Sequence, residues 1–225
     1  MAGRQRVPRP ADARPGAPSP WADVTPTGRI LTLRDVRERC ADLPEPRPGP
    51  PREADTRDAA VLVPVFERGG EAHVVLTHRP DAMPNHSGEV AFPGGKIDPA
   101  LDVDARAAAL REAEEEIGLP RDAVELIGEL DTMHTVSGPF LIAPFVGVLD
   151  PLPTLRPNPS EVERVFDVAL SELLADGVHH EERWRFPHED RGVHFFELED
   201  ETVWGATARI LVGFLAHLVH VPVLD

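Results

Sequence analysis

GGKIDPALDVDARAAALREAEEEIGL, residues 94–119, is the stretch that decides the fold. Its second half predicts a helix over 103–117, which Gly118 ends as the C-cap, with Pro120 just beyond. Three apolar residues of this helix share one arc and predict the face that packs on a core: Leu110, Ala113 and Ile117.

Three glutamates lie together on a neighbouring arc of the same helix. Glu112, Glu115 and Glu116 are spaced i, i+3, i+4, so they fall within roughly 100° of one another. Their mutual repulsion of roughly 0.2–0.5 kcal/mol per pair calls for a compensating charge, and oxygen-rich sites suit Mg²⁺ or Mn²⁺. A run of glutamates on a helix is more often only a solvated face. Glu114, which points away from the other three, fits that simpler interpretation.

The residues before the helix favour the metal interpretation. Gly94 and Gly95 end a predicted strand in a tight turn, where glycine allows positive φ and a close approach of the backbone to a ligand. The carbonyl of Gly95 is then a candidate hard oxygen ligand. Arg111 lies off the carboxylate arc, and we expect it to tie the helix to the loop 95–104 by a charge-assisted hydrogen bond.

This stretch resembles the signature of the Nudix hydrolases, G-x5-E-x7-R-E-U-x-E-E-x-G-U, where U is aliphatic. The positions that match it are Arg111, Glu112, Glu115, Glu116, Gly118 and Leu119. Ala113 meets its aliphatic position only weakly. The loop is two residues longer than the pattern and places Leu101 where a glutamate is usual. We expect Asp102 to take that glutamate's place, with Asp104 and Asp98 as alternatives.

Residues 76–95, LTHRPDAMPNHSGEVAFPGG, resemble the segment before the box in the coenzyme A pyrophosphatase-like Nudix proteins, L-L-T-x-R-[SA]-x3-R-x3-G-x3-F-P-G-G. Pro80 replaces its small residue and Pro84 replaces its second arginine, which would be a natural phosphate partner. The resemblance implies substrate binding by Arg79, His86 and Gly88. Three more segments resemble the same subgroup: 130–149, 157–170 and 203–211.

The resemblance implies an enzyme that hydrolyses a nucleoside diphosphate-linked substrate at its pyrophosphate bridge. Coenzyme A or an acyl-CoA would give 4′-phosphopantetheine and adenosine 3′,5′-bisphosphate. The implied catalytic residues are Glu112, Glu115, Glu116 and Arg111, with Glu112 as general base or metal ligand. The implied ligands of Mg²⁺ or Mn²⁺ are Gly95, the same three glutamates and a downstream carboxylate, for which Glu161 is the first candidate and Glu163 the second.

Two other functions stay open. The first is a Nudix pyrophosphatase that acts on ADP-ribose, NADH or an oxidised nucleotide. The second is a non-catalytic nucleotide-binding Nudix module. Such modules generally have a degraded box, whereas this helix keeps every glutamate of the pattern.

The hydrophobic patterns along the chain predict an α+β fold. We expect hairpin strands at 59–67 and 72–79 around Gly69-Gly70, and further strands at 123–131, 141–149 and 193–199. We also expect a strand at 160–170 that turns into a short helix through 171–176, and an apolar helix within 207–223. The resemblance implies the Nudix fold, an α/β/α sandwich with a mixed sheet flanked by helices.

The first 55 residues differ from the rest. They hold 11 of the 25 prolines and carry a net charge of +2, within a chain of 225 residues whose net charge is −16. We expect residues 1–55 to be a largely disordered extension, disordered through about residue 28, with a short helix from Thr32 to Cys40. Residues 56–225 are expected to form the Nudix hydrolase domain.

The charge and the single cysteine exclude several classes of protein. A net charge of −16 argues against a nucleic-acid-binding surface, which needs a basic face. With Cys40 alone, no internal disulfide framework forms. No apolar run of about 18 residues predicts a membrane span, and the N-terminus does not resemble a secretory signal. We therefore expect a cytoplasmic monomer or homodimer whose partner is a small molecule.

Overall fold

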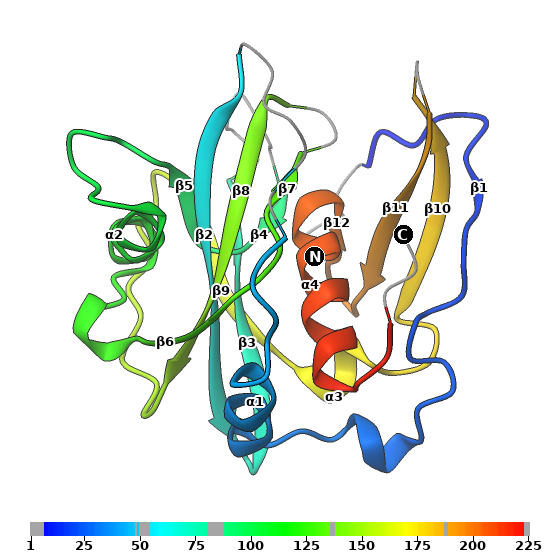
Figure 1. Cartoon of the computed structure of the whole chain (residues 1–225), viewed down its shortest axis with the longest axis horizontal. Helices are drawn as coiled ribbons and strands as arrows, with labels where there is room; N and C mark the ends of the chain where they lie inside the picture. The colour runs from blue at the N-terminus through cyan, green and yellow to red at the C-terminus, as the bar shows by residue number, and fades with distance from the viewer. Residues whose placement is uncertain are drawn as a thin grey trace.

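The computed structural model places two β-sheets around a long C-terminal helix (Figure 1). The structure describes residues 7–47, 49, 55–80, 88–135, 138–186 and 189–222. In chain order, its elements are β1 (Arg14–Pro15), η1 (Pro26–Arg29), α1 (Leu33–Cys40), β2 (Arg57–Arg68), β3 (Glu71–His78), β4 (Val90–Ala91), β5 (Gly94–Lys96), α2 (Ala105–Ile117), η2 (Arg121–Ala123), β6 (Glu125–Glu129), β7 (Met133–His134), β8 (Phe140–Leu149), β9 (Arg164–Ala169), α3 (Leu170–Leu173), β10 (His179–Arg185), β11 (Asp190–Glu197), β12 (Thr202–Trp204) and α4 (Gly205–Leu218).

The larger sheet is mixed, as expected. Its main path runs β4-β3-β2-β8-β6, while β5, β7 and β9 pair with β2, β8 and β3. The central pair β2–β8 is parallel, and β2–β3 is the predicted antiparallel hairpin. Gly69 and Gly70 form its turn with φ of 64° and 86°, which suits glycine.

Helices cover both faces of this sheet, which confirms the expected α/β/α arrangement. Successive residues of a strand point to opposite faces, so Leu62 belongs to the core under α2 while Val63 belongs to the core on the other side. The helix α2 packs on the first face through small residues, among them Ala109 and Ala113. On the opposite face lie α1 and α4 (Figure 1). Among the described residues, no helix is long and apolar enough to cross a bilayer.

The second sheet was not predicted as a separate layer. Four antiparallel strands in the order β1-β10-β11-β12 form it, and α4 lies between it and the mixed sheet (Figure 1). Only β11 was expected as a strand. The sequence of β10, HHEERWR, contains four charged residues, so it shows no apolar alternation even though Trp184 and His179 are buried.

The expectation of disorder through residue 28 is wrong for the part of the extension that the structure describes. Trp21 is 1% exposed; its ring stacks on Phe196 and packs at a tilt against His179 of the second sheet. The strand β1 pairs with β10. Proline content suggested a chain with little to bury, but a single tryptophan supplies a large apolar surface. The helix at Thr32–Cys40 was predicted correctly; Thr32 is its N-cap, in a capping box with Asp35.

Candidate active site

The helix α2 carries the predicted carboxylates on its last two turns. Asp104 caps its first turn by accepting a hydrogen bond from the Ala107 N–H at 2.8 Å. Gly118 ends it in the left-handed conformation, with φ of 64°. The helix therefore begins and ends where its sequence has the matching caps, and this fixes which side chains meet β5.

Two glycines let β5 pack closely against its neighbours, Gly94 against β2 and Gly95 against α2. A Cβ atom on Gly94 would lie 2.4 Å from the Ala60 carbonyl oxygen, and Gly94 has φ of 157°. A Cβ atom on Gly95 would lie 2.5 Å from the carboxyl carbon of Glu112. The backbone contact at Gly94 excludes any side chain, and a side chain at Gly95 would have to displace the carboxyl group of Glu112. The backbone of β5 therefore lies against the carboxyl groups of Glu112 and Glu116, and the role of the Gly95 carbonyl as a metal ligand stays a prediction.

Glu116 is the most buried of the three glutamates, at 4% exposed. Its Oε2 accepts a hydrogen bond from the Gly94 N–H at 3.0 Å, and its Oε1 lies 3.8 Å from a guanidinium nitrogen of Arg79. Burial raises the pKa of Glu116 to about 7, against these two favourable contacts, and the nearby Glu112 and Glu161 raise it further.

Glu112 is in a similar position but less buried. Burial raises its pKa, and Glu115 and Glu161 act in the same direction, while Arg111 at 2.9 Å opposes them. The charge of Glu161 thus acts on both Glu112 and Glu116. Glu161 therefore lies within electrostatic range of both helix carboxylates, and its role as a metal ligand stays a prediction.

The segment before Glu161 is fixed to the end of α2 by its backbone. The Arg156 N–H donates to the Ile117 carbonyl at 2.7 Å, and the Asn158 N–H donates to the Glu116 carbonyl at 2.8 Å. Backbone donors leave no pattern of residue types, so these two contacts are not predictable from the sequence. Glu163, the second candidate, instead faces His78 at 3.7 Å.

Arg111 ties the helix to the preceding loop, which confirms that prediction. It donates to both oxygens of Asp102, at 2.8 and 2.9 Å, and to the Lys96 carbonyl at 3.1 Å. Both Arg111 and Asp102 are 8% exposed. Hydrogen bonds from Arg111 hold the pKa of Asp102 below its usual value. Asp102 therefore takes the place of the expected glutamate.

The remaining glutamates of the helix are more exposed. The side chain of Glu115 is 52% exposed and accepts a hydrogen bond from Arg111 at 2.9 Å. Glu114 points away toward Arg121, which donates to it at 2.7 Å, and this agrees with its predicted role as a solvated residue.

The donor chemistry fits a divalent cation, although no metal-holding group of three or more acidic, histidine or cysteine side chains is preassembled in the described part of the chain. Arg111 holds Glu112 and Glu115, and the Gly94 N–H holds one oxygen of Glu116. Even so, the charges of Glu115 and Glu161 raise the pKa of Glu112, and those of Glu112 and Glu161 raise the pKa of Glu116. Uncompensated negative charge on hard oxygen atoms is what Mg²⁺ or Mn²⁺ would relieve.

Of the three predicted substrate residues, Arg79 lies beside this site, 3.8 Å from Glu116. Arg79 continues β3 and its N–H donates to the Glu89 carbonyl at 3.0 Å. Gly88, with φ of 65°, begins the return toward β4. His86 lies outside the described residues.

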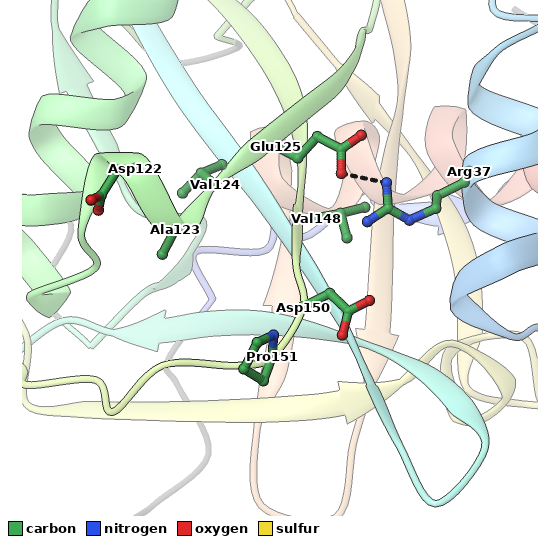
Figure 2. Close-up of a pocket in the computed structure, with 8 residues that line it drawn as sticks. All are labelled: Arg37, Asp122, Ala123, Val124, Glu125, Val148, Asp150 and Pro151. Carbon is green, nitrogen blue, oxygen red and sulfur yellow. Dashed lines mark hydrogen bonds and ion pairs between the residues drawn. The ribbon is translucent and has the colours of Figure 1, made fainter.

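A cavity of about 260 Å³ lies elsewhere in the molecule, between η2, β6 and the end of β8. Figure 2 shows the residues that line it. Arg37 of α1 reaches over it to Glu125. None of the predicted site residues lines this cavity. The carboxylates on α2, rather than this cavity, therefore form the candidate active site.

Comparison with known proteins agrees with this geometry. The family model described as "NUDIX domain" matches residues 56–210. The chain is 39% identical over 184 residues to the "Uncharacterized Nudix hydrolase NudL" of Photorhabdus laumondii, covering 81% of this chain and 95% of that protein. It is equally similar to the protein of the same name from Escherichia coli K12, covering 81% and 93%. A MutT/nudix family protein from Enterococcus faecalis shares the fold, with a TM-score of 0.52 at 16% identity over 76% of this chain and 65% of that chain. The chain therefore belongs to the Nudix hydrolase family.

Proposed function

We propose that this Nudix hydrolase cleaves coenzyme A or an acyl-CoA at the diphosphate bridge, giving 4′-phosphopantetheine and adenosine 3′,5′-bisphosphate. One observation carries the proposal. Two described residues of the segment that resembles the coenzyme A pyrophosphatase pattern, 76–95, lie against a helix carboxylate. Arg79 and Gly94 from this segment both contact Glu116, at 3.8 and 3.0 Å.

The residues around the site would have separate roles in metal binding, substrate binding and positioning. Glu112, Glu116 and Glu161, with the Gly95 carbonyl and Glu115, would hold Mg²⁺ or Mn²⁺. When bound, such an ion neutralises phosphate charge and activates a water molecule. Arg79, whose side chain is 24% exposed, lies where a guanidinium can bind a phosphate oxygen. Arg111 and Asp102 hold the helix against the loop and so fix the directions of the carboxylates.

A substrate panel at one fixed metal concentration tests the proposal. Coenzyme A, octanoyl-CoA, ADP-ribose, NADH and 8-oxo-dGTP are compared by product release. The proposal expects the highest kcat/KM with coenzyme A or its thioester. A higher kcat/KM with ADP-ribose, NADH or 8-oxo-dGTP would show that this compound, rather than coenzyme A, is the preferred substrate. Tight binding of a nucleotide with no product released from any of the five compounds would indicate a non-catalytic binding module.

The proposed setting is the cytoplasm, since the described chain has one cysteine, Cys40, which is a buried free thiol. We propose a monomer or homodimer. Light scattering on the purified protein distinguishes the two states, and a fluorescent fusion shows the location.

A further inference from the structure

A second cavity lies on the same face of the mixed sheet as α2. Its volume is about 420 Å³, within the range of small-molecule sites. One wall is the segment 152–157, with Leu152, Leu155 and Pro157, and the other is formed by Phe66, Val75 and the strand β9. We call this cavity the β9 groove.

The β9 groove begins beside the candidate active site. Pro157 in its wall precedes Asn158, whose N–H donates to the Glu116 carbonyl at 2.8 Å. Glu163, at the other wall, follows Glu161 by two residues, and its N–H donates to the His78 carbonyl at 2.9 Å. The groove then follows β9 as far as Asp167. The segment 157–163, which carries Glu161, therefore connects the groove wall to the candidate active site.

The charges in the groove select an uncharged ligand. Among the described lining residues, Arg164 is the only cation, and it is already paired with the buried Glu201 and lies over the Phe166 ring at 4.8 Å. The lining also contains Asp167, which is held by Arg68 at 2.6 Å, and Glu163. An adenosine bisphosphate bound there would lie beside two carboxylates, with no unpaired cation among the described lining residues. An uncharged apolar chain would instead contact the apolar side chains of the groove walls.

We infer that the β9 groove binds the acyl-pantetheine arm of the substrate, so that acyl-CoA thioesters are preferred over ligands that lack the arm. This inference rests on the proposed function, because that function supplies a substrate with one highly charged half and one uncharged half. The groove would then place the charged half at the carboxylates.

The test changes Leu155, which is half-buried in the groove wall and distant in sequence from the helix carboxylates. Leu155→Trp fills the groove, and Leu155→Ser removes apolar contact without filling it. Ile30→Trp is the matched control, because Ile30 is 51% exposed and outside the groove. Thermal unfolding of each variant establishes that it is folded.

Two readouts separate the inference from the proposed function. First, calorimetry with S-octanoyl-pantetheine should show binding to the parent and to Ile30→Trp, and at least about tenfold weaker binding to both Leu155 variants. Second, kcat/KM for octanoyl-CoA should fall about tenfold in Leu155→Trp, while that for adenosine 3′-phosphate 5′-diphosphate, which lacks the arm, stays within about twofold.

The inference is overturned if the parent does not bind S-octanoyl-pantetheine, or if Leu155→Trp lowers activity on both substrates equally. If neither substrate is hydrolysed with Mg²⁺ or Mn²⁺, the proposed function fails. The calorimetric result then tests, independently of catalysis, whether the β9 groove binds the acyl-pantetheine arm.

Discussion

Replacing Asp102 with alanine should destabilise the protein more than any other single change in the loop before α2. Asp102 accepts two hydrogen bonds from Arg111 and one from the Asp98 N–H at 2.8 Å. The substitution leaves a guanidinium that is 8% exposed without its main carboxylate partner. Breaking a buried pair costs about 3–5 kcal/mol, and we take about 3 because Arg111 keeps its other contacts.

Urea unfolding measures this loss. With a slope of about 2 kcal/mol/M, a loss of about 3 kcal/mol lowers the midpoint by about 1.5 M. Asp98→Ala is the matched control, since the Asp98 side chain accepts only an exposed bond from the Ala100 N–H at 2.9 Å. We expect its midpoint to fall by less than about 0.5 M. Equal midpoints for the two variants would refute the structural role assigned to Asp102.

The same pair has a pH signature. Arg111 depresses the pKa of Asp102 in the folded state, so the unfolded state binds a proton first. The stabilisation is therefore complete above the unfolded value of 3.8 and is lost as pH falls through the folded value. The gap between the parent and Asp102→Ala should stay constant from pH 7 to about pH 5 and shrink below about pH 4.

Three further predictions concern the site and the extension. Glu115→Gln should abolish Mg²⁺-dependent product release with little change in the urea midpoint, while the control Glu114→Gln should keep its activity. Full activity of Glu115→Gln would show that Glu115 is not part of the active site. Gly95→Ala should lower kcat about a hundredfold, because its Cβ displaces the neighbouring carboxyl group, whereas Gly213→Ala, with open space around it, should leave kcat unchanged. Burial lowers the pKa of His179 to about 3, so stability is lost as pH falls below the unfolded value of 6.5, by about 2 kcal/mol between pH 7 and pH 5. Urea unfolding at the two pH values checks this, and His179→Asn with the same loss would contradict it.

The mixed sheet and α2 were predictable because their signals are local. Gly69 and Gly70 mark the hairpin between two β-rich runs, and Gly118 marks the end of the helix. The second sheet was not predictable in the same way. Its strand β10 is held by pairing with β11. The charged residues of β10 form ion pairs, so its sequence has no apolar alternation that would predict a strand.

The loop before α2 shows where the sequence left alternatives. Asp98, Asp102 and Asp104 all lie within seven positions, and spacing alone did not separate their roles. In the structure, Asp104 caps the helix and Asp98 closes a local turn with Ala100. Asp102 is left to meet Arg111. Each role depends on the path of the backbone through the loop, and the spacing of residues along the sequence does not determine that path.

The N-terminal extension has a practical consequence for anyone preparing this protein. A truncated chain that starts at residue 56, where the family match begins, would lose Trp21, Leu33 and Val36 from the main hydrophobic core. It would also expose the surfaces of Phe196 and His179 against which Trp21 packs. Such a fragment should aggregate or express poorly. The unit that must be produced intact is thus longer than the unit that defines the family.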